Sequence, residues 1–427
     1  MGSPSEPKHS RRKKGIGRFL AILGPGLITG AADDDPSGIA TCSMAGAQQG
    51  TALLWTALIT WPLMGCVQMM CARIGMVTGR GLAGTLRMKF PIWLIAIASF
   101  ALFIANTINI GADLAGMADS VQMFTGLGSH WFVPVLAVSI TMAAICFRYK
   151  RIEKILKWLA LSLLAYIITG IICRPPWAKI LWQTIVPTWP SNHEAWATLV
   201  ALLGTTISPY LFYWQTSQEV EEKKAKGQKK LAARRDASRE EVGRRRLDVA
   251  IGTFASQLVT YFIILTTAIT LHAGGATKVE TSRQAAEALR PFAGAFAAQL
   301  FAAGVIGTGL LAIPTMAGSA AYAFAETFAW RQGLDERLPR APAFYAVFIA
   351  SMIMAMSVDL FHVSPIQALY WSAVINGLLA PLLLLGILLV ACDRVIMRDQ
   401  CSSGISRIVV ALATLLMFGA AIGMFIF

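Results

Sequence analysis

The chain contains the run Gly24-Pro-Gly-Leu-Ile-Thr-Gly-Ala-Ala-Asp33-Asp34-Asp35-Pro36-Ser37-Gly38, which places three carboxylates and a proline inside one long apolar segment. A second interrupted segment reads Leu203-Gly204-Thr205-Thr206-Ile207-Ser208-Pro209-Tyr210, with apolar sequence on both sides. Proline removes a backbone N–H and frees a carbonyl one turn earlier. Inside a membrane, such unpaired groups are tolerated only beside protein or a hydrated cavity. Both breaks are therefore predicted to line a cavity.

The composition predicts an all-α polytopic membrane protein. Of 427 residues, 56% are hydrophobic and 14% charged, which is too apolar for a soluble domain of this size. A helix needs roughly 20 apolar residues to cross a bilayer. Eleven segments meet this requirement, and they lie near 16–47, 51–77, 91–119, 131–147, 154–174, 194–220, 247–272, 294–330, 341–359, 363–391 and 405–427.

The basic residues follow membrane topology. A net charge of +14 is also seen in nucleic-acid-binding proteins, but alternating loops place all but five of the 37 Lys and Arg residues on one side. The positive-inside rule then predicts a multi-pass protein of the cell membrane, with the lipid bilayer and not a nucleic acid as its partner. The tail 1–15 and the basic segment 221–246 are predicted to be cytoplasmic, and the C-terminus extracytoplasmic. We interpret 221–246 as an exposed helix or mobile loop, with a lipid or partner site as the alternative.

The positions of the two breaks predict an internal repeat. They fall in spans one and six, so residues 16–174 and 194–391 each hold five spans, and span eleven (405–427) lies outside the repeat. An odd number of spans gives the two halves opposite orientations, and such inverted repeats hold their site at the interface between them. No residue-level identity supports this symmetry.

Asp35 is the first candidate for a functional residue, because a carboxylate at mid-membrane is costly. It precedes a proline, where the backbone leaves helical geometry. The Ser208 hydroxyl and the Thr205 carbonyl would add oxygen ligands, which suit hard divalent cations. Asp33 and Asp34 would lie on other faces and guide cations. The alternatives are that the acidic stretch ends a shorter span and that Ser208-Pro209 is a structural kink.

Other chemistry has little support in the sequence. The seven cysteines form no CxxC pair, and there is no phosphate-binding loop, nucleophile elbow or HExxH motif. We predict no enzyme activity, no cofactor other than the transported ion and no obligate protein partner. Glu326 and Asp359 are interpreted as interfacial.

An ordered set of motifs resembles the Nramp family of divalent metal transporters. The set comprises Gly24 to Gly38, Leu54-Trp55 through Ala72-Arg-Ile-Gly-Met-Val-Thr-Gly79, Arg151-Ile-Glu-Lys, Gly204 to Pro209, and Leu300-Phe301 through Ala317-Gly318. The resemblance implies a LeuT-like fold of five plus five inverted spans, with discontinuous helices one and six and alternating access.

The departures from the family pattern are informative about the ion. Gly38 stands where the family usually has an Asn ligand, and Thr205, Ser208 and Tyr210 replace its usual Ala, Met and His. Without the soft thioether and the Asn side chain, the site would be roomier. Such a site suits Mg²⁺, because this ion dehydrates reluctantly and keeps several bound waters. The chain thus looks most like the Nramp-related magnesium transporter branch, and its expected metal site comprises Asp35, Gly38, Thr205, Ser208 and Tyr210.

Proton coupling in the family is associated with the span-six His and with an acidic pair in span three. Tyr210 removes the His, and Asn109 and Ala112 stand near the acidic positions, beside Asp113. We therefore expect a uniporter for Mg²⁺ and Mn²⁺ driven by membrane potential. The alternatives are a proton-coupled Mn²⁺/Fe²⁺ symporter and a Na⁺-coupled carrier of an organic solute. Hydrogen bonding within the bundle is the favoured interpretation of Asn106, Asn109 and Asp113, and bundle packing is that of Gln367 and Asn376.

Overall fold

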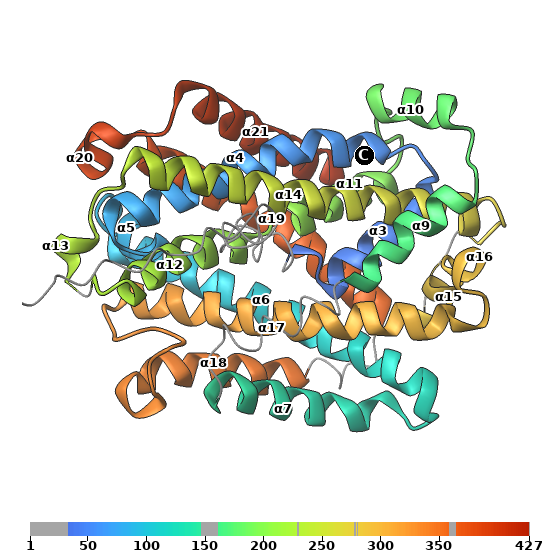
Figure 1. Ribbon diagram of the computed structural model, residues 1–427, viewed down its shortest axis with the longest axis horizontal. Coiled ribbons are helices and arrows are strands. Elements are labelled where there is room, and N and C mark those ends of the chain that lie inside the picture. The colour runs from blue at the N-terminus through green and yellow to red at the C-terminus, as the bar shows by residue number, and fades with distance from the viewer. Residues whose placement is uncertain are drawn as a thin grey trace, which may run out of the picture.

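The computed structural model describes residues 33–146, 161–228, 230–276, 279, 281–357 and 364–426, and in these ranges the chain is helical without a β-strand. The predicted tail 1–15, the start of span one, the basic motif at 151–154 and Asp359 lie outside the described residues. Figure 1 shows long helices running side by side in one bundle.

Every predicted span has a helical counterpart. The described residues contain eight helices long and apolar enough to cross a membrane, together with a shorter apolar helix and the described parts of spans one and five. In chain order the span helices are α3 (Pro36–Gln49), α4 (Leu54–Thr78), α6 (Ile92–Thr125), α7 (Phe132–Cys146), α9 (Leu164–Ile172), α11 (His193–Thr206) with α12 (Pro209–Ala225), α14 (Arg239–Thr267), α17 (Ala297–Thr327), α18 (Pro342–Met356), α19 (Pro365–Ala391) and α21 (Gly404–Ile426). The shorter connecting helices are α5 (Leu82–Leu86), α10 (Trp177–Ile185), α13 (Leu231–Arg234), α15 (Ser282–Glu287), α16 (Arg290–Ala293) and α20 (Arg394–Met397).

The outside of the bundle is apolar. Large hydrophobic side chains such as Val135, Leu415 and Phe425 are exposed, whereas Trp214 and Tyr322 are buried among the helices. An exposed apolar surface of this extent is unfavourable in water and favourable in lipid. The distribution of side chains therefore fits a chain that crosses the bilayer many times.

Helices of the two halves pack on each other. Helix α3 contacts α11, α14 and α19, α4 contacts α12 and α14, and α6 contacts α17 and α19. The two sets of five spans therefore form one interlocked bundle.

The basic segment 221–246 differs from the sequence-based interpretation. Helix α12 continues to Ala225, and α14 begins at Arg239, where Ser238 and Glu241 form a capping box. Lys223 is buried, and its ammonium group donates to the carbonyls of Met76, Arg234 and Asp236 at 2.7, 2.9 and 2.7 Å. Part of this segment is therefore packed against α4, so the expectation of an exposed helix or mobile loop was wrong there.

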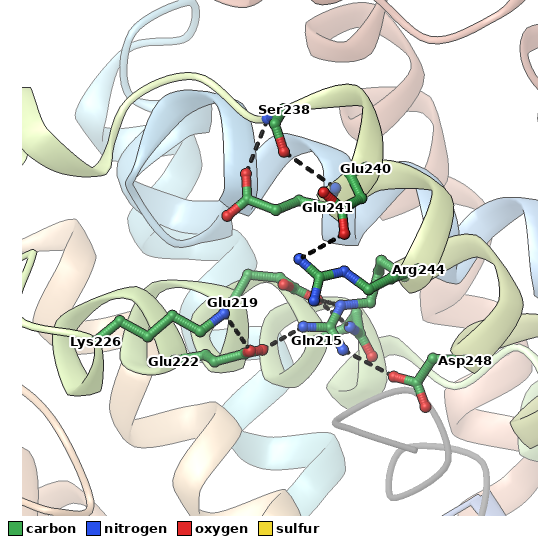
Figure 2. Close-up of polar contacts among 10 residues, drawn as sticks. Gln215, Glu219, Glu222, Lys226, Ser238, Glu240, Glu241, Arg244 and Asp248 are labelled. Atoms are coloured by element: carbon green, nitrogen blue, oxygen red, sulfur yellow. Dashed lines mark hydrogen bonds and ion pairs between the residues drawn. The ribbon is translucent and has the colours of Figure 1, made fainter. Parts of the chain in front are cut away.

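An ion-pair cluster joins α12 to α14 at the same end of the bundle (Figure 2). The Arg245 guanidinium pairs with Glu219 Oε1 at 2.6 Å and Asp248 Oδ2 at 2.8 Å, and also with Glu222. Glu219 and Asp248 are buried, and Gln215 donates to Glu219 Oε1 at 2.7 Å. The cluster fixes the second half of span six to span seven.

We expect the Arg245→Ala variant to lose about 3 kcal/mol of stability, because it leaves two buried carboxylates without their cation. Thermal unfolding of the detergent-solubilised protein measures the loss. The control is Arg244→Ala, which removes a 60% exposed side chain 3.8 Å from Glu240 and should cost close to nothing. Equal melting temperatures for the two variants would contradict a structural role of the cluster.

Candidate metal site

At both breaks an N-cap residue with extended backbone is followed by a proline that begins the helix. Asp35 is the N-cap of α3 with extended backbone, Pro36 begins the helix, and Asp35 Oδ1 accepts from the Gly38 N–H at 2.6 Å. Helix α11 ends at Thr206, Ser208 is the extended N-cap of α12, and Pro209 begins that helix. Proline suits the first helical position because its missing N–H would have no intrahelical partner there. The Asp-Pro and Ser-Pro pairs therefore restart each helix after its break.

The two breaks meet at Gly38. A methyl group placed on Gly38 would lie 3.1 Å from Thr205 Oγ1, 3.4 Å from Asp35 Oδ1 and 3.5 Å from the Asp33 carbonyl oxygen. Asp35, Thr205 and Ser208 are all buried. A carboxylate, a hydroxyl and a main-chain carbonyl thus converge where glycine leaves room, which is the oxygen chemistry that Mg²⁺ and Mn²⁺ bind.

Asp35 is oriented by a chain of hydrogen bonds from three helices. Asn109 of α6 donates to Asp35 Oδ2 at 3.2 Å, and Ser372 of α19 donates to Asn109 Oδ1 at 2.6 Å. The hydroxyls of Ser372 and Ser37 lie 3.2 Å apart, so this series of hydrogen bonds ends on α3, the helix that Asp35 caps. Asn109 therefore makes hydrogen bonds within the bundle, as its sequence context suggested, and one of them holds the Asp35 carboxylate in position.

A thioether lies in the next layer around Asp35. The Asn109 amide nitrogen that contacts Asp35 is also 2.8 Å from Met316 Sδ, and Asn106 donates to the Met316 carbonyl at 2.8 Å. The sequence comparison had suggested surroundings of oxygen alone. Met316 reaches this position from α17, so a soft atom remains close to the site although span six has lost its methionine.

Ser208 and Tyr210 have other contacts. The Ser208 hydroxyl turns back onto α11, where it donates to the carbonyls of Gly204 at 2.8 Å and Thr205 at 2.7 Å. Tyr210 is buried in the first turn of α12, and its carbonyl accepts from Ser319 Oγ at 2.9 Å. Of the five expected site residues, Asp35 and Thr205 thus both have side-chain oxygens next to Gly38. Ser208 contacts Thr205, and the hydrogen bond described for Tyr210 leads to α17.

Further acids lie near the break. Asp33 and Asp34 both contact the Ser256 hydroxyl of α14, at 2.9 and 3.0 Å. Because one hydroxyl has one proton to donate, the two carboxylates share it. Asp113 is buried one helical turn after Asn109 and so faces the same side of α6. Three further carboxyl groups thus lie around Asp35.

The two polar residues of span ten, Asn376 and Gln367, lie in different surroundings. Asn376 is buried, whereas Gln367 is exposed and lines a separate cavity of about 360 Å³ with Gln48, Glu194 and Tyr370. Glu326 lies at the end of α17, where it is buried and accepts from Gly84 N, Ser217 Oγ and Gln332 Nε2 at 3.2, 3.1 and 3.2 Å.

Three residues near Asp35 were not predicted as part of the site: Asn109, which was interpreted as a bundle hydrogen-bonding residue, and Ser372 and Met316, which were not singled out. Asn109 could have been found from the sequence, because it is a polar residue within the apolar run of span three. Ser372 and Met316 are ordinary residues of apolar helices, and they carry no such signal. Their helices bring them to Asp35.

Two interrupted helices that meet at a buried carboxylate, within paired sets of five spans, define a multi-pass membrane protein of the LeuT-like fold. The comparisons with known proteins give the family. The chain belongs to the Nramp family, because the family model described as natural resistance-associated macrophage protein-like matches residues 26–427.

Relatives and solved structures agree with this assignment. A protein from Caldanaerobacter subterraneus named divalent metal cation transporter MntH is 23% identical over 92% of this chain and 89% of its own length. The protein of that name from Chromohalobacter salexigens is 26% identical over 89% and 85%. A mutant of the Eremococcus coleocola manganese transporter has a TM-score of 0.73 at 16% identity, covering 96% of this chain and 87% of that one. Mhp1, a nucleobase-cation-symport-1 family transporter, has a TM-score of 0.52 at 13% identity, covering 93% and 92%. At such identities the two structures support the fold.

Proposed function

We propose that the protein transports divalent metal cations across the cell membrane by alternating access, and that it takes up Mg²⁺ and also Mn²⁺. The observation that carries this proposal is the buried Asp35 carboxylate, which lies with Thr205 and Gly38 at the junction of two broken helices. Membership of the Nramp family and relatives named as divalent metal transporters support the ion class.

The preference for Mg²⁺ rests on the residues around the break. Glycine at position 38 and threonine and serine at positions 205 and 208 provide small groups or oxygen atoms and no thioether. An oxygen site suits a hard ion that dehydrates reluctantly. The carboxyl groups of Asp33, Asp34 and Asp113 add further oxygen atoms near the break, and oxygen atoms are the ligands of hard cations.

Membrane potential is the proposed driving force. With the N-terminus cytoplasmic, as the loop charges predict, inward movement of two charges through 100 mV is favoured by roughly 4.6 kcal/mol. This is enough to accumulate the ion without protons. Tyr210 supports an uncoupled mechanism, because a buried tyrosine gains or loses a proton near neutral pH far less readily than histidine.

The test is transport into proteoliposomes loaded with a Mg²⁺ dye and a pH dye. With an inside-negative potential, Mg²⁺ and Mn²⁺ are expected to enter while the lumenal pH stays constant. Liposomes without protein are the control. Acidification that follows the metal would contradict the uniport mechanism, and absence of any metal flux would contradict transport itself.

Met316 favours a second candidate, a proton-coupled transporter of transition metals. Its sulfur lies 2.8 Å from the Asn109 amide that touches Asp35, so a small rearrangement would bring a soft ligand to the ion. Thioethers select softer metals than Mg²⁺. The two candidates therefore differ in whether this sulfur contacts the ion during transport.

The Met316→Leu variant separates them. If the ion keeps its water and oxygen ligands, we expect Mg²⁺ uptake within about twofold of wild type, because the two side chains have similar volumes. Competition by Cd²⁺ should also be unchanged. Met352→Leu, a buried methionine of α18, is the matched control. Weakening of Cd²⁺ competition by about tenfold, or 1.4 kcal/mol, in Met316→Leu alone would favour the transition-metal candidate.

A further inference from the structure

A stripe of exposed and half-exposed side chains runs along the outer face of α4. Leu58, Trp61, Gly65, Met69 and Arg73 follow one another at intervals of three or four residues, so they lie on one side of the helix. Figure 1 shows α4 between α14 and α21, and both helices contact it. Arg73 is the one charged residue of α4, and the loop charges predict that its end of the helix is cytoplasmic.

Helix α14 has a matching stripe beside it. Arg246, Ala250, Phe254 and Leu258 are exposed at intervals of four residues. Arg245 lies about 100° around the helix from its neighbour, and it pairs with carboxylates inside the bundle. Arg246 is thus on the outer surface, and apolar side chains follow it toward the middle of the membrane.

Two contacts align the stripes. The rings of Trp61 and Phe254 meet edge to face, with their centroids 5.2 Å apart. A methyl group placed on Gly65 would lie 3.4 Å from Thr253 Oγ1. Residue numbers rise along α4 where they fall along α14, so the two helices are antiparallel and the stripes form one continuous surface.

The same register brings two arginines to one level of the bundle. Arg73 lies eight residues beyond Gly65, and Arg246 lies seven residues before Thr253. At 1.5 Å per residue, these steps correspond to about 12 and 10 Å along neighbouring helices. The difference is less than one helical turn, so Arg73 and Arg246 end the two stripes together.

The charges of these two arginines are not balanced by nearby acids. Helices α4 and α21 contain no Asp or Glu. The acids of α14, Glu240, Glu241 and Asp248, are engaged in ion pairs or in the helix cap. Arg73 and Arg246 take part in none of the ion pairs of the described residues.

We propose that the predicted cytoplasmic ends of α4 and α14 bind an anionic phospholipid, with Arg73 and Arg246 on its phosphate and an acyl chain along the stripes. Guanidinium groups bind phosphate oxygens with parallel N–H donors, and basic sites beside membrane helices attract anionic headgroups. Trp61 lies twelve residues from Arg73, or about 18 Å along the helix. One leaflet of hydrocarbon is about 15 Å thick, so an acyl chain spans the stripe.

The experiment titrates phosphatidylglycerol or phosphatidylcholine into the full chain in detergent and counts bound lipids by native mass spectrometry. Wild type should bind the first phosphatidylglycerol about tenfold more tightly, because each arginine adds attraction for an anionic headgroup. The Arg73→Gln/Arg246→Gln variant should lose this preference. The control is Arg337→Gln, an exposed arginine of the α17–α18 connection, which should keep it. Arg246→Gln, which changes an exposed side chain, replaces the double variant if the latter aggregates.

A second measurement locates the lipid on the stripe. In nanodiscs, phosphatidylglycerol with brominated acyl chains should quench Trp61 fluorescence more strongly than brominated phosphatidylcholine at the same mole fraction. The difference between wild type and Trp61→Phe isolates the Trp61 signal. Arg246→Gln should remove the excess quenching.

Each result decides the proposal. A preference for phosphatidylglycerol that requires Arg73 and Arg246 supports it. Equal affinity for the two lipids, or equal loss of preference in Arg337→Gln, overturns it. Displacement of bound phosphatidylglycerol by inorganic phosphate would assign the arginines to a soluble phosphate compound and would also overturn it. Because Asp35 lies elsewhere, Asp35→Ala should keep the lipid preference, so this test is independent of metal transport.

Discussion

The Asp35→Ala variant is expected to lose Mg²⁺ uptake by about 100-fold or more, since metal sites depend strongly on their ligands and supporting groups. Asp35 is the carboxylate that the Gly38 N–H and the Asn109 amide hold at the break, 2.6 and 3.2 Å from its two oxygens. Its removal leaves Thr205 and main-chain carbonyls, whose dipoles replace the water of a dication poorly without a negative charge. Initial uptake rates in dye-loaded proteoliposomes measure the effect.

Two further variants show whether charge or folding is responsible. Asp35→Asn keeps the shape and an oxygen that accepts from Gly38 N–H, so it should fold like wild type and still be inactive. Asp119→Asn changes an acid near the far end of α6 that accepts from Ser282 N at 3.1 Å, and it should transport normally. Retained uptake in Asp35→Asn would show that the ion does not need this charge, and the proposed site would be wrong.

The Gly204→Ala variant is expected to cost more than about 3 kcal/mol and to remove most of the folded protein, because overpacking against backbone is poorly relieved. A methyl group on Gly204 would lie 2.2 Å from the Ala373 carbonyl oxygen and 2.3 Å from Gly377 N. These atoms belong to the backbone of α19, so no side chain can move aside. Small residues at such crossings allow membrane helices to approach closely. Size-exclusion profiles and melting temperatures in detergent measure the loss.

The matched control is Gly419→Ala in α21. A methyl group at this helical position meets no atom within 4 Å, so the variant should be as stable as wild type or slightly more so. If Gly204→Ala were as stable as Gly419→Ala, the close approach of α11 and α19 would not occur in the membrane. The carbonyl of Thr205 follows directly on Gly204, so this helix contact also positions the metal site.

Much of the fold could be read from the sequence because membrane spans are long and apolar. The predicted spans recur as helices, and the breaks at Asp35-Pro36 and Ser208-Pro209 begin new helices where proline allows. The prediction was weaker where folding depends on charge. Lys223 and Arg245 belong to a basic run that suggested an exposed segment, yet Lys223 is buried and Arg245 is half-buried, and each contacts a partner on another helix. Composition cannot reveal such partners.

The chain alone determined the number of spans, the two interruptions and the choice of Asp35, because each depends on residues adjacent in sequence and on the cost of placing polar groups in lipid. The tertiary structure decided which neighbours reach that carboxylate. Asn109, Ser372 and Met316 come from three helices, and rotation of any of them by one residue would turn its side chain by about 100°. Helix packing sets those rotations, so contact between distant residues is a property of the whole bundle.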